Sequence, residues 1–539
     1  MGAPDLIRNQ VMWNRLIAIV EEQAQVLVRA SFSTSTREAG DLSAGVFDAQ
    51  GRMLAQSVTG TPGHVNSMAA SVLHFLAEFP IDTMRPGDIY LTNDPWKGTG
   101  HLYDVVVVTP VFRTVDGQPQ PVALFACTSH MTDVGGVGFG LGATDVFNEG
   151  LYLPLIRFAR NGVFDETVMR IIRANTRTPD MVDGDIHSLA ACNERGALRL
   201  GEMMDEFDLD DLDDLAEHII DRSRQAMLRI IGELPHGTWH STMRIDGVDE
   251  PLDLVAAMTV SATGIDVDFA GTSPQAPVGI NVPMAYTDAY TSFGVRCIVG
   301  PSVPNNSGSL GVIRVTAPVG SILNAPHPAP VNVRHVVGQM LPDTVFGCLS
   351  QILPDLVPAE GTSSLWNILI DGQAADGERY VVMSFHSGGA GARPGADGLS
   401  ATAFPSGVRN MPVEINEAIS PIVFWRKEFR PDSGGDGKYR GGHGQVVEIG
   451  NREGMPFSIS ATYERTVHPA RGRAGGGAGA LGELRLKQRN EAVKPLGRST
   501  IPGDDRLVMQ FPGGGGFGDP TERDGDKATA ERLDGLVTE

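Results

Sequence analysis

The sequence is short of cysteine and of positive charge. Its 539 residues include only 4 cysteines, and no two of them form a CxxC pair: Cys127, Cys192, Cys297 and Cys348. We therefore expect reduced thiols rather than a disulfide framework or a thiolate zinc cluster. Lys and Arg number 43 against 65 Asp and Glu, which gives a formal net charge of −22. Nucleic acid and anionic membranes need basic patches, so neither is an expected partner.

Long apolar runs and several familiar motifs are also missing. No run approaches the roughly 18 apolar residues of a membrane span, and the N-terminal MGAPDLIRNQ lacks the features of a signal peptide. These absences predict a cytoplasmic protein. The sequence has no Gly-x4-Gly-Lys-Ser/Thr loop, no Gly-x-Ser-x-Gly elbow and no HExxH. Neither ATP binding by this chain nor a serine hydrolase is therefore indicated.

What the sequence does contain is glycine, proline and short apolar segments. The 65 Gly and 35 Pro indicate a globular protein rich in turns. Amphipathic helical segments and short strands predict a mixed α/β (α+β) fold of several domains, β-rich with glycine-rich loops and a largely β C-terminal region. We expect an N-terminal domain at 1–205, a central α/β domain at 206–420 that starts with an acidic helix, a glycine-rich β region at 421–520 and a charged tail at 521–539. A single buried helix is expected at 332–355.

Two predicted strands carry polar residues at their ends. VVVVTPVF (105–112) is apolar throughout, and PVALFACTS (121–129) follows it after an Asp116-Gly117 turn signal. If these strands form an antiparallel hairpin centred on Gly117, Asp104 lies directly opposite His130, with Cβ atoms about 5 Å apart. The length of the connection also allows a register one or two residues away.

A metal site is one interpretation of this pairing. His101 lies three residues before Asp104, in the bend that enters the strand, and could turn back to the same point as His130. Two imidazoles and a carboxylate suit a divalent Zn, Mn or Fe ion and leave a position open for water. Asp41, at the start of another predicted strand, is a possible fourth ligand. The alternative is that each histidine is an ordinary hydrogen-bonded residue at a strand end.

Further residues near these segments are candidates for acid–base catalysis or for orienting groups around a metal. One lies in the loop TPGHVNS, one in NDPWKG and two in the glycine-rich stretch after His130: His64, Asp94, Asp133 and Glu149. For each of them, an ordinary polar loop residue is the alternative.

At these residues the sequence resembles the hydantoinase B/oxoprolinase family, and the resemblance runs along most of the chain. It rests on REAGDLSAGVFDAQGRMLAQ, GDIYLTNDPWKGTGHLYDVVVVTPVF, SHMTDVGG, FNEGLYLP and the near-terminal PGGGGFGDP. The resemblance implies one divalent metal, with zinc first and manganese or iron as alternatives, held by His101, Asp104, His130 and plausibly Asp41. The chain has NDPWKGTGH and HMTDVGG where the family commonly has NDPYHGGTH and HHADIGG, which leaves the substrate class open.

The resemblance also implies a division of labour between two chains. The family comprises B-type subunits of ATP-dependent hydantoinases and lactamases, the matching half of 5-oxoprolinase, and the large subunits of acetone and acetophenone carboxylases. A partner A-type subunit would bind ATP and Mg and phosphorylate the oxygen of a cyclic amide (a hydantoin, oxoproline or lactam), and metal-activated water would then open the ring. Such a chain is active only with its partner, in a hetero-oligomer. A ketone carboxylase subunit and a non-catalytic scaffold that has lost its metal are the alternatives.

Overall fold

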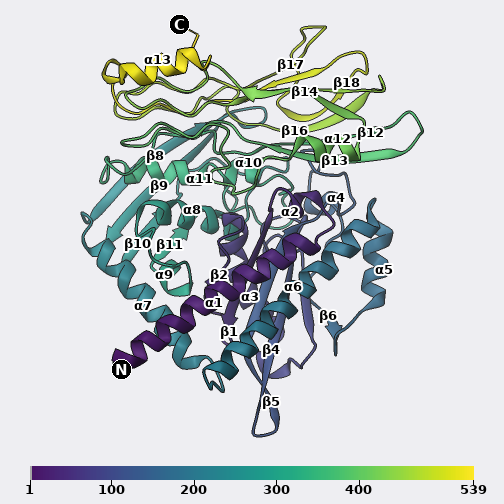
Figure 1. Ribbon diagram of the computed structural model, residues 1–539, viewed down its shortest axis with the longest axis vertical. Coiled ribbons are helices and arrows are strands. Elements are labelled where there is room, and N and C mark those ends of the chain that lie inside the picture. Colours follow the sequence, from purple (N-terminus) through teal and green to yellow (C-terminus); the bar gives the residue numbers. More distant parts are fainter. Residues whose placement is uncertain (1–2, 539) are drawn as a thin grey trace.

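Four β-sheets organise the computed structural model, which describes residues 3–538 (Figure 1). One sheet has seven strands and each of the other three has four. Helices are interspersed among them along the chain. This arrangement confirms the predicted mixed α/β fold. Among the described helices, none combines the length and the apolar character that crossing a bilayer would require.

The seven-stranded sheet carries most of the residues singled out from the sequence. Its order is β2-β1-β5-β4-β3-β6-β7. Helices α1 and α6 lie side by side over one face (Figure 1), and α3 packs on the other. The bounds are β1 (Leu42–Asp48), β2 (Met53–Gln56), β3 (Ile89–Thr92), β4 (Asp104–Val115), β5 (Gln118–His130), β6 (Ile156–Arg160), β7 (Val163–Phe164), α1 (Ala3–Ala30), α3 (Pro62–Glu78) and α6 (Pro179–Glu206).

Helices cover both faces of the seven-stranded sheet, and this explains the continuous apolar character of β4 and β5. Side chains alternate between the two faces of a strand. Val46 and Phe125 join the hydrophobic cluster with α1 and α6, whereas Phe47 and Leu124 join the cluster with α3. Because neither face of β4 and β5 is exposed to solvent, apolar residues are favoured at successive positions near the centres of both strands.

A four-stranded sheet and a group of helices follow. The sheet has the order β11-β10-β9-β8 and is packed by α7 and α11. Its elements are α7 (Asp213–Gly232), β8 (Gly237–Ile245), β9 (Leu252–Ser261), β10 (Gly264–Asp268), α8 (Met284–Ile298), α9 (Ser307–Leu310), β11 (Ile313–Thr316), α10 (His335–Gly338) and α11 (Leu341–Leu349). The remaining short elements before residue 240 are α2 (Thr34–Arg37), η1 (Ile81–Thr83), α4 (Val146–Glu149) and α5 (Glu166–Asn175).

Two expected helices are interrupted in this region. The acidic run 206–217 is not one helix, because α6 ends at Glu206 and α7 begins at Asp213. The segment 332–355 is likewise divided, into α10 and α11. Pro342 lies in the first turn of α11, where the absence of its backbone N–H is tolerated. Inside a continuous helix the same proline would remove a hydrogen bond, which explains why α10 and α11 are separate.

Two four-stranded sheets form the top of the molecule in Figure 1. Their elements, with the helices near them, are β12 (Trp366–Gln373), β13 (Arg379–His386), α12 (Val413–Ile419), β14 (Ile422–Phe429), β15 (Gln445–Asn451), β16 (Phe457–Thr462), β17 (Glu483–Leu486), β18 (Leu496–Ile501), β19 (Leu507–Gln510), η2 (Pro520–Glu522) and α13 (Gly525–Leu533). Glycine-rich segments cross here at very short range. A Cβ on Gly514 would lie 2.0 Å from the carbonyl oxygen of Ala390, so only glycine fits.

Candidate metal centre

The β4–β5 hairpin places Asp104 directly opposite His130, as predicted. The turn is tight: Val115 pairs with Gln118, and both intervening residues have positive φ. Continued without interruption, that register would put Asp104 opposite the residue before His130. A β-bulge next to Val111 shifts the register by one residue and restores the pairing with His130.

Neighbouring strands and loops bring three more predicted residues to the same edge of the sheet. Asp41 immediately precedes β1, and its carbonyl accepts the His130 backbone N–H at 3.2 Å. His101 lies in the bend before β4, and His64 lies in the first turn of α3. All of these residues are buried, and none is more than 8% exposed. Residues from four separate segments therefore converge around Asp104.

One carboxylate oxygen of Asp104 is held by the surrounding protein. Oδ2 accepts a hydrogen bond from the Thr99 hydroxyl at 2.7 Å and lies 2.9 Å from Nε2 of His64. It also forms an ion pair with the Arg334 guanidinium. Arg334 in turn donates from Nε to the Thr99 carbonyl and lies over the Tyr286 ring, 4.0 Å from its centroid. These contacts fix the orientation of the carboxylate.

The other oxygen of Asp104 faces two imidazoles. Oδ1 lies 2.9 Å from Nε2 of His101 and 3.2 Å from Nδ1 of His130. Nδ1 of His101 lies 2.9 Å from the backbone carbonyl of Asn332. A carbonyl can only accept, so Nδ1 carries the proton and Nε2 of His101 presents a lone pair. Despite its proximity to Oδ1, this Nε2 has no hydrogen-bond partner in the part of the chain that the structure describes.

These atoms fit a divalent cation. His101, Asp104 and His130 each offer a ligand atom, and the three atoms lie within 4.8 Å of one another. The Nε2 atoms of both histidines and Nδ1 of His64 are buried without a hydrogen-bond partner among residues 3–538. A lone pair turned toward a carboxylate oxygen is repulsive unless a cation lies between them. Nitrogen and carboxylate ligands together suit Zn, Mn or Fe.

A small cavity of about 30 Å³ adjoins this cluster. Asp41 lines it, with its carboxylate 3.6 Å from Nδ1 of His64, and His64, His101 and His130 line it too. Sequence reasoning missed several of the other lining residues, which come from α8, the α10 region and β12: Tyr286, Arg334, His335, Gln339 and Asn367. The one signal for them was the adjacent Arg334 and His335 inside the largely apolar segment VNVRHVVG.

Burial and neighbouring charges set the protonation of the cluster. Burial, reinforced by the Arg334 charge, lowers the pKa of His101 to about 3, and the same two causes lower the pKa of His335 to about 3. Burial alone would raise the pKa of Asp104, yet His101, His64 and Arg334 hold it well below its ordinary value. For His64, burial is outweighed by Asp104 and then Asp41, so its pKa is raised. His101 is therefore neutral and Asp104 ionised near neutral pH.

The remaining predicted catalytic residues lie outside this cavity. Asp133 forms an ion pair with Arg177 at 2.7 Å. The Asp94 carboxylate accepts the backbone N–H of Trp96. Glu149 is fully buried, and its Oε1 accepts the N–H groups of residues 331 and 332. Through Asn332, Glu149 is one step removed from His101.

Glu149→Gln is expected to flatten the pH dependence of stability. Burial raises the pKa of Glu149 to about 8, so the folded chain retains a proton that the unfolded chain releases near its ordinary value of about 4. This contribution is complete below about pH 4 and is lost as the pH rises toward 8. Urea unfolding at intervals across this range would measure the change in slope. An unchanged slope in the Gln variant would contradict the assignment.

Glu149→Ala provides the comparison. It removes the acceptor of two buried backbone N–H groups, so it should lower the free energy of unfolding at every pH, by about 1–3 kcal/mol for each group left unpaired. Gln keeps an acceptor oxygen and should avoid that loss.

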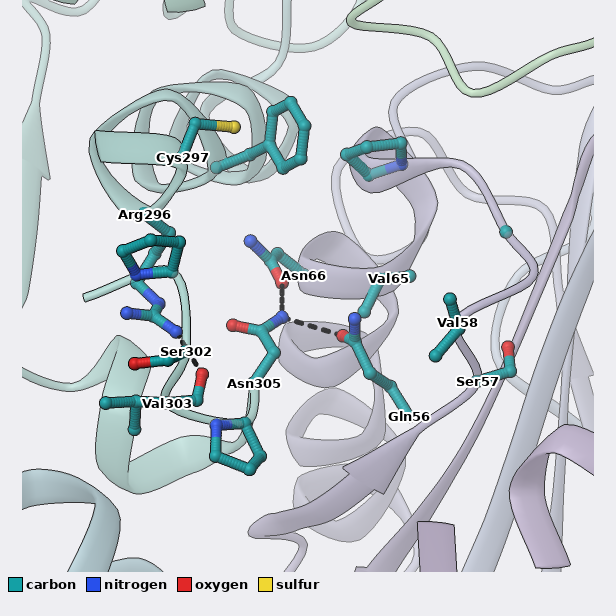
Figure 2. A pocket seen from close by; sticks show the side chains of 15 residues that line it. Gln56, Ser57, Val58, Val65, Asn66, Arg296, Cys297, Ser302, Val303 and Asn305 are labelled. Carbon is teal, nitrogen blue, oxygen red and sulfur yellow. Dashed lines mark hydrogen bonds between the residues drawn. The ribbon is translucent and has the colours of Figure 1, made fainter. Parts of the chain in front are cut away.

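A second cavity, of about 410 Å³, borders the segment that leads into α3 (Figure 2). Gly60 and Pro62 line it, whereas Thr61 between them lines the small cavity. Figure 2 shows carboxamides turned toward one another: Asn305 donates to Gln56 at 2.7 Å and to Asn66 at 3.1 Å. The proposed ligands are therefore separated from this space by one segment of chain.

Comparisons with known proteins agree over nearly the whole chain. A family model described as hydantoinase B/oxoprolinase matches residues 5–520. A Pseudomonas sp. (strain NS671) protein named as the B-type subunit of a D-/L-hydantoinase is 30% identical over 99% of this chain and 93% of its own length. 5-Oxoprolinase 1 of Arabidopsis thaliana is 27% identical over 95% of this chain, which spans only 42% of the plant protein.

Two solved structures share the fold. The ATP-dependent caprolactamase from Pseudomonas jessenii has a TM-score of 0.90 at 24% identity, covering 99% of this chain and 95% of that one. The nucleotide-free acetone carboxylase has a TM-score of 0.86 at 20% identity, covering 98% of this chain and 78% of that one. At these identities the likeness establishes the fold alone.

Proposed function

Because the chain belongs to the hydantoinase B/oxoprolinase family, as the match over residues 5–520 shows, we propose that it is the metal-bearing B-type subunit of an ATP-dependent cyclic-amide hydrolase. The observation that carries this proposal is the bare Nε2 of His101 facing the ionised Asp104 at 2.9 Å. Relatives named as a hydantoinase subunit and as 5-oxoprolinases support the choice of cyclic amides as substrates.

Each residue of the cluster has a distinct role in the proposal. His101, Asp104 and His130 hold a divalent ion, and Asp41 is a further ligand. When bound, the ion would supply Lewis acidity and lower the pKa of water in the cavity. His64 lies between Asp104 and Asp41 and is the candidate for holding or moving a proton. Thr99 and Arg334 keep Asp104 oriented.

ATP chemistry is assigned to a partner chain. An amide carbonyl is a poor electrophile, and phosphorylating its oxygen creates a reactive carbon and a good leaving group. An A-type, ATP-binding subunit would carry out that step and pass the activated ring to this chain. The support is that this chain covers only 42% of an oxoprolinase relative and has no Gly-x4-Gly-Lys-Ser/Thr loop. The isolated chain should therefore not open amide rings, even with ATP.

Metal analysis tests the centre directly. The purified chain is expected to carry one divalent ion per molecule, and His101→Ala and His130→Ala should each lose it. His386→Ala is the matched control, because His386 is a fully buried histidine on β13 outside the cavity. A metal-free wild type, or a metal content unaffected at His101 and His130, would favour the scaffold alternative.

A second activity is kept because the chain also shares the fold of acetone carboxylase. Assays with the co-expressed A-type partner separate the two chemistries. Ring opening that proceeds in bicarbonate-free buffer supports the hydrolase, whereas consumption of a ketone only with bicarbonate supports the carboxylase. Ring opening by this chain alone would contradict the proposed division of labour.

A further inference from the structure

The cavity beside Asp104 is too small for a ring substrate. Its volume of about 30 Å³ matches roughly one water molecule. A cyclic amide must therefore lie mainly in an adjoining space and extend only its reacting group toward His101 and His130. Two larger spaces adjoin the cluster, and their polar groups distinguish them.

In the cavity of Figure 2, the carboxamide and guanidinium side chains already bond to other protein groups rather than being available to a ligand. Its carboxamides are bonded to one another. Among the described residues that line it, the one cationic side chain is Arg296, which is 8% exposed and donates to the carbonyl oxygens of Val299, Gly300 and Val303. These groups stabilise the loop after α8 and leave no free charge directed at the cavity.

The other space is a groove of about 700 Å³, within the range of small-molecule sites. We name it the arginine groove; the lining residues that matter here are Tyr103, Phe139, Arg177, Asp371, Arg379 and Arg498. Phe139 lines both the groove and the small cavity. The Tyr103 ring stacks on His130 with centroids 5.3 Å apart, and Phe139 meets His130 edge-on at 5.6 Å. Two aromatic rings that line the groove thus contact the imidazole of a proposed metal ligand.

The charge of the groove favours an anion. Its two carboxylates are already paired: Asp133 with Arg177 at 2.7 Å and Asp371 with Arg498 at 2.8 Å. Arg379, at the start of β13, forms no ion pair with any residue of the described chain 3–538. One guanidinium therefore remains free to bind a carboxylate or a phosphoryl group.

We propose that the arginine groove binds an anionic form of the ring substrate, with the ring against Tyr103 and Phe139 and the anionic substituent at Arg379. The inference rests on the proposed function for the identity of the ring. The anion is either a carboxylate on the ring or the phosphoryl group added in the ATP-dependent step. The exposed guanidinium of Arg379 binds both by the same chemistry.

Calorimetric titration of the full chain, with its metal content measured, tests the groove. The probes are 5-oxoproline, 2-pyrrolidinone (the same ring without the carboxylate) and inorganic phosphate. Arg379→Gln is expected to weaken binding of 5-oxoproline by about threefold to fivefold and to leave 2-pyrrolidinone unchanged. Arg224→Gln is the matched control, because Arg224 is an exposed arginine on α7 that does not line the groove. Its affinities should equal those of the wild type.

A steric variant gives an independent readout. Val137 lines the groove and is 54% exposed, so Val137→Trp should fill space there without disturbing the core. It is expected to weaken binding of 5-oxoproline and 2-pyrrolidinone alike. The groove assignment is overturned if Val137→Trp leaves both affinities unchanged, or if Arg379→Gln and Arg224→Gln behave identically with every anionic probe.

The same titrations distinguish a ring carboxylate from a phosphoryl group as the anion. They also distinguish failure of the groove assignment from failure of the proposed function. Arg379-dependent binding of 5-oxoproline assigns a ring carboxylate, and Arg379-dependent binding of phosphate alone assigns the phosphoryl group. His101→Ala should keep Arg379-dependent binding while losing metal. If the wild type has no metal but Arg379 still governs anion binding, the proposed function fails and the groove stands. If metal and ring opening are present but Arg379→Gln does not weaken binding of any anionic probe, the groove assignment fails and the proposed function stands.

Discussion

Asp104→Asn is expected to abolish stoichiometric metal binding and to lower the free energy of unfolding by about 3–5 kcal/mol. Within residues 3–538, Asp104 is the one carboxylate that contacts both His101 and His130, so losing its charge should weaken metal affinity by more than about 100-fold. The same change leaves the Arg334 guanidinium, which is 2% exposed, without its counter-charge. Metal analysis and urea unfolding measure the two effects separately.

Asp48→Asn is the matched control for this variant. Asp48 is also fully buried, lies on β1 of the same sheet and forms an ion pair with Arg52 at 2.6 Å. It should lose stability and keep its metal. If the Asp48 variant loses metal as readily as the Asp104 variant, metal loss reflects general loosening of the sheet rather than a missing ligand. Full metal occupancy in Asp104→Asn would overturn the ligand assignment itself.

The part of the site that is local in sequence could be predicted. Two continuous apolar segments and a turn signal were enough to pair β4 with β5 and to bring Asp104 opposite His130. The register nevertheless depends on the β-bulge beside Val111, and no residue in the segment predicts that bulge. The prediction centred the hairpin on Gly117, whereas the tight turn alone would pair Asp104 with the residue before His130. The bulge shifts the register by one residue, so the predicted pairing is the observed one.

The part that depends on tertiary contacts could not be predicted. Arg334 reaches Asp104 across 230 positions of sequence, and periodicity carries no information at that range. Asp133 shows the same limit: the sequence left it as either a catalytic candidate or a plain loop carboxylate, and could not predict its ion pair with Arg177 from a later segment. Glu149 is directed at the backbone of Asn332 rather than at the cavity. Residue type and local spacing predicted the candidate ligands, whereas the residues that contact and orient Asp104 come from distant elements.

Arg334→Met should be the most revealing substitution among those orienting residues. It replaces a buried guanidinium with an apolar chain of similar length and leaves Asp104 ionised in a buried site, at an expected cost of about 3–5 kcal/mol. Part of that cost comes from the Thr99 carbonyl, which loses the Nε donor of Arg334. The single variant therefore does not isolate the ion pair.

A double-mutant cycle with Asp104→Asn isolates it. If the two charges compensate each other, the double variant should be more stable than the sum of the single effects implies by at least about 2 kcal/mol. A divalent ion provides an independent check, because it can replace the guanidinium as counter-charge. Adding ion at about 100 times its Kd should raise the stability of Arg334→Met by about 2.7 kcal/mol and leave Asp104→Asn unchanged. Additive single effects, or equal responses of both variants to the ion, would show that Arg334 and the metal do not share Asp104.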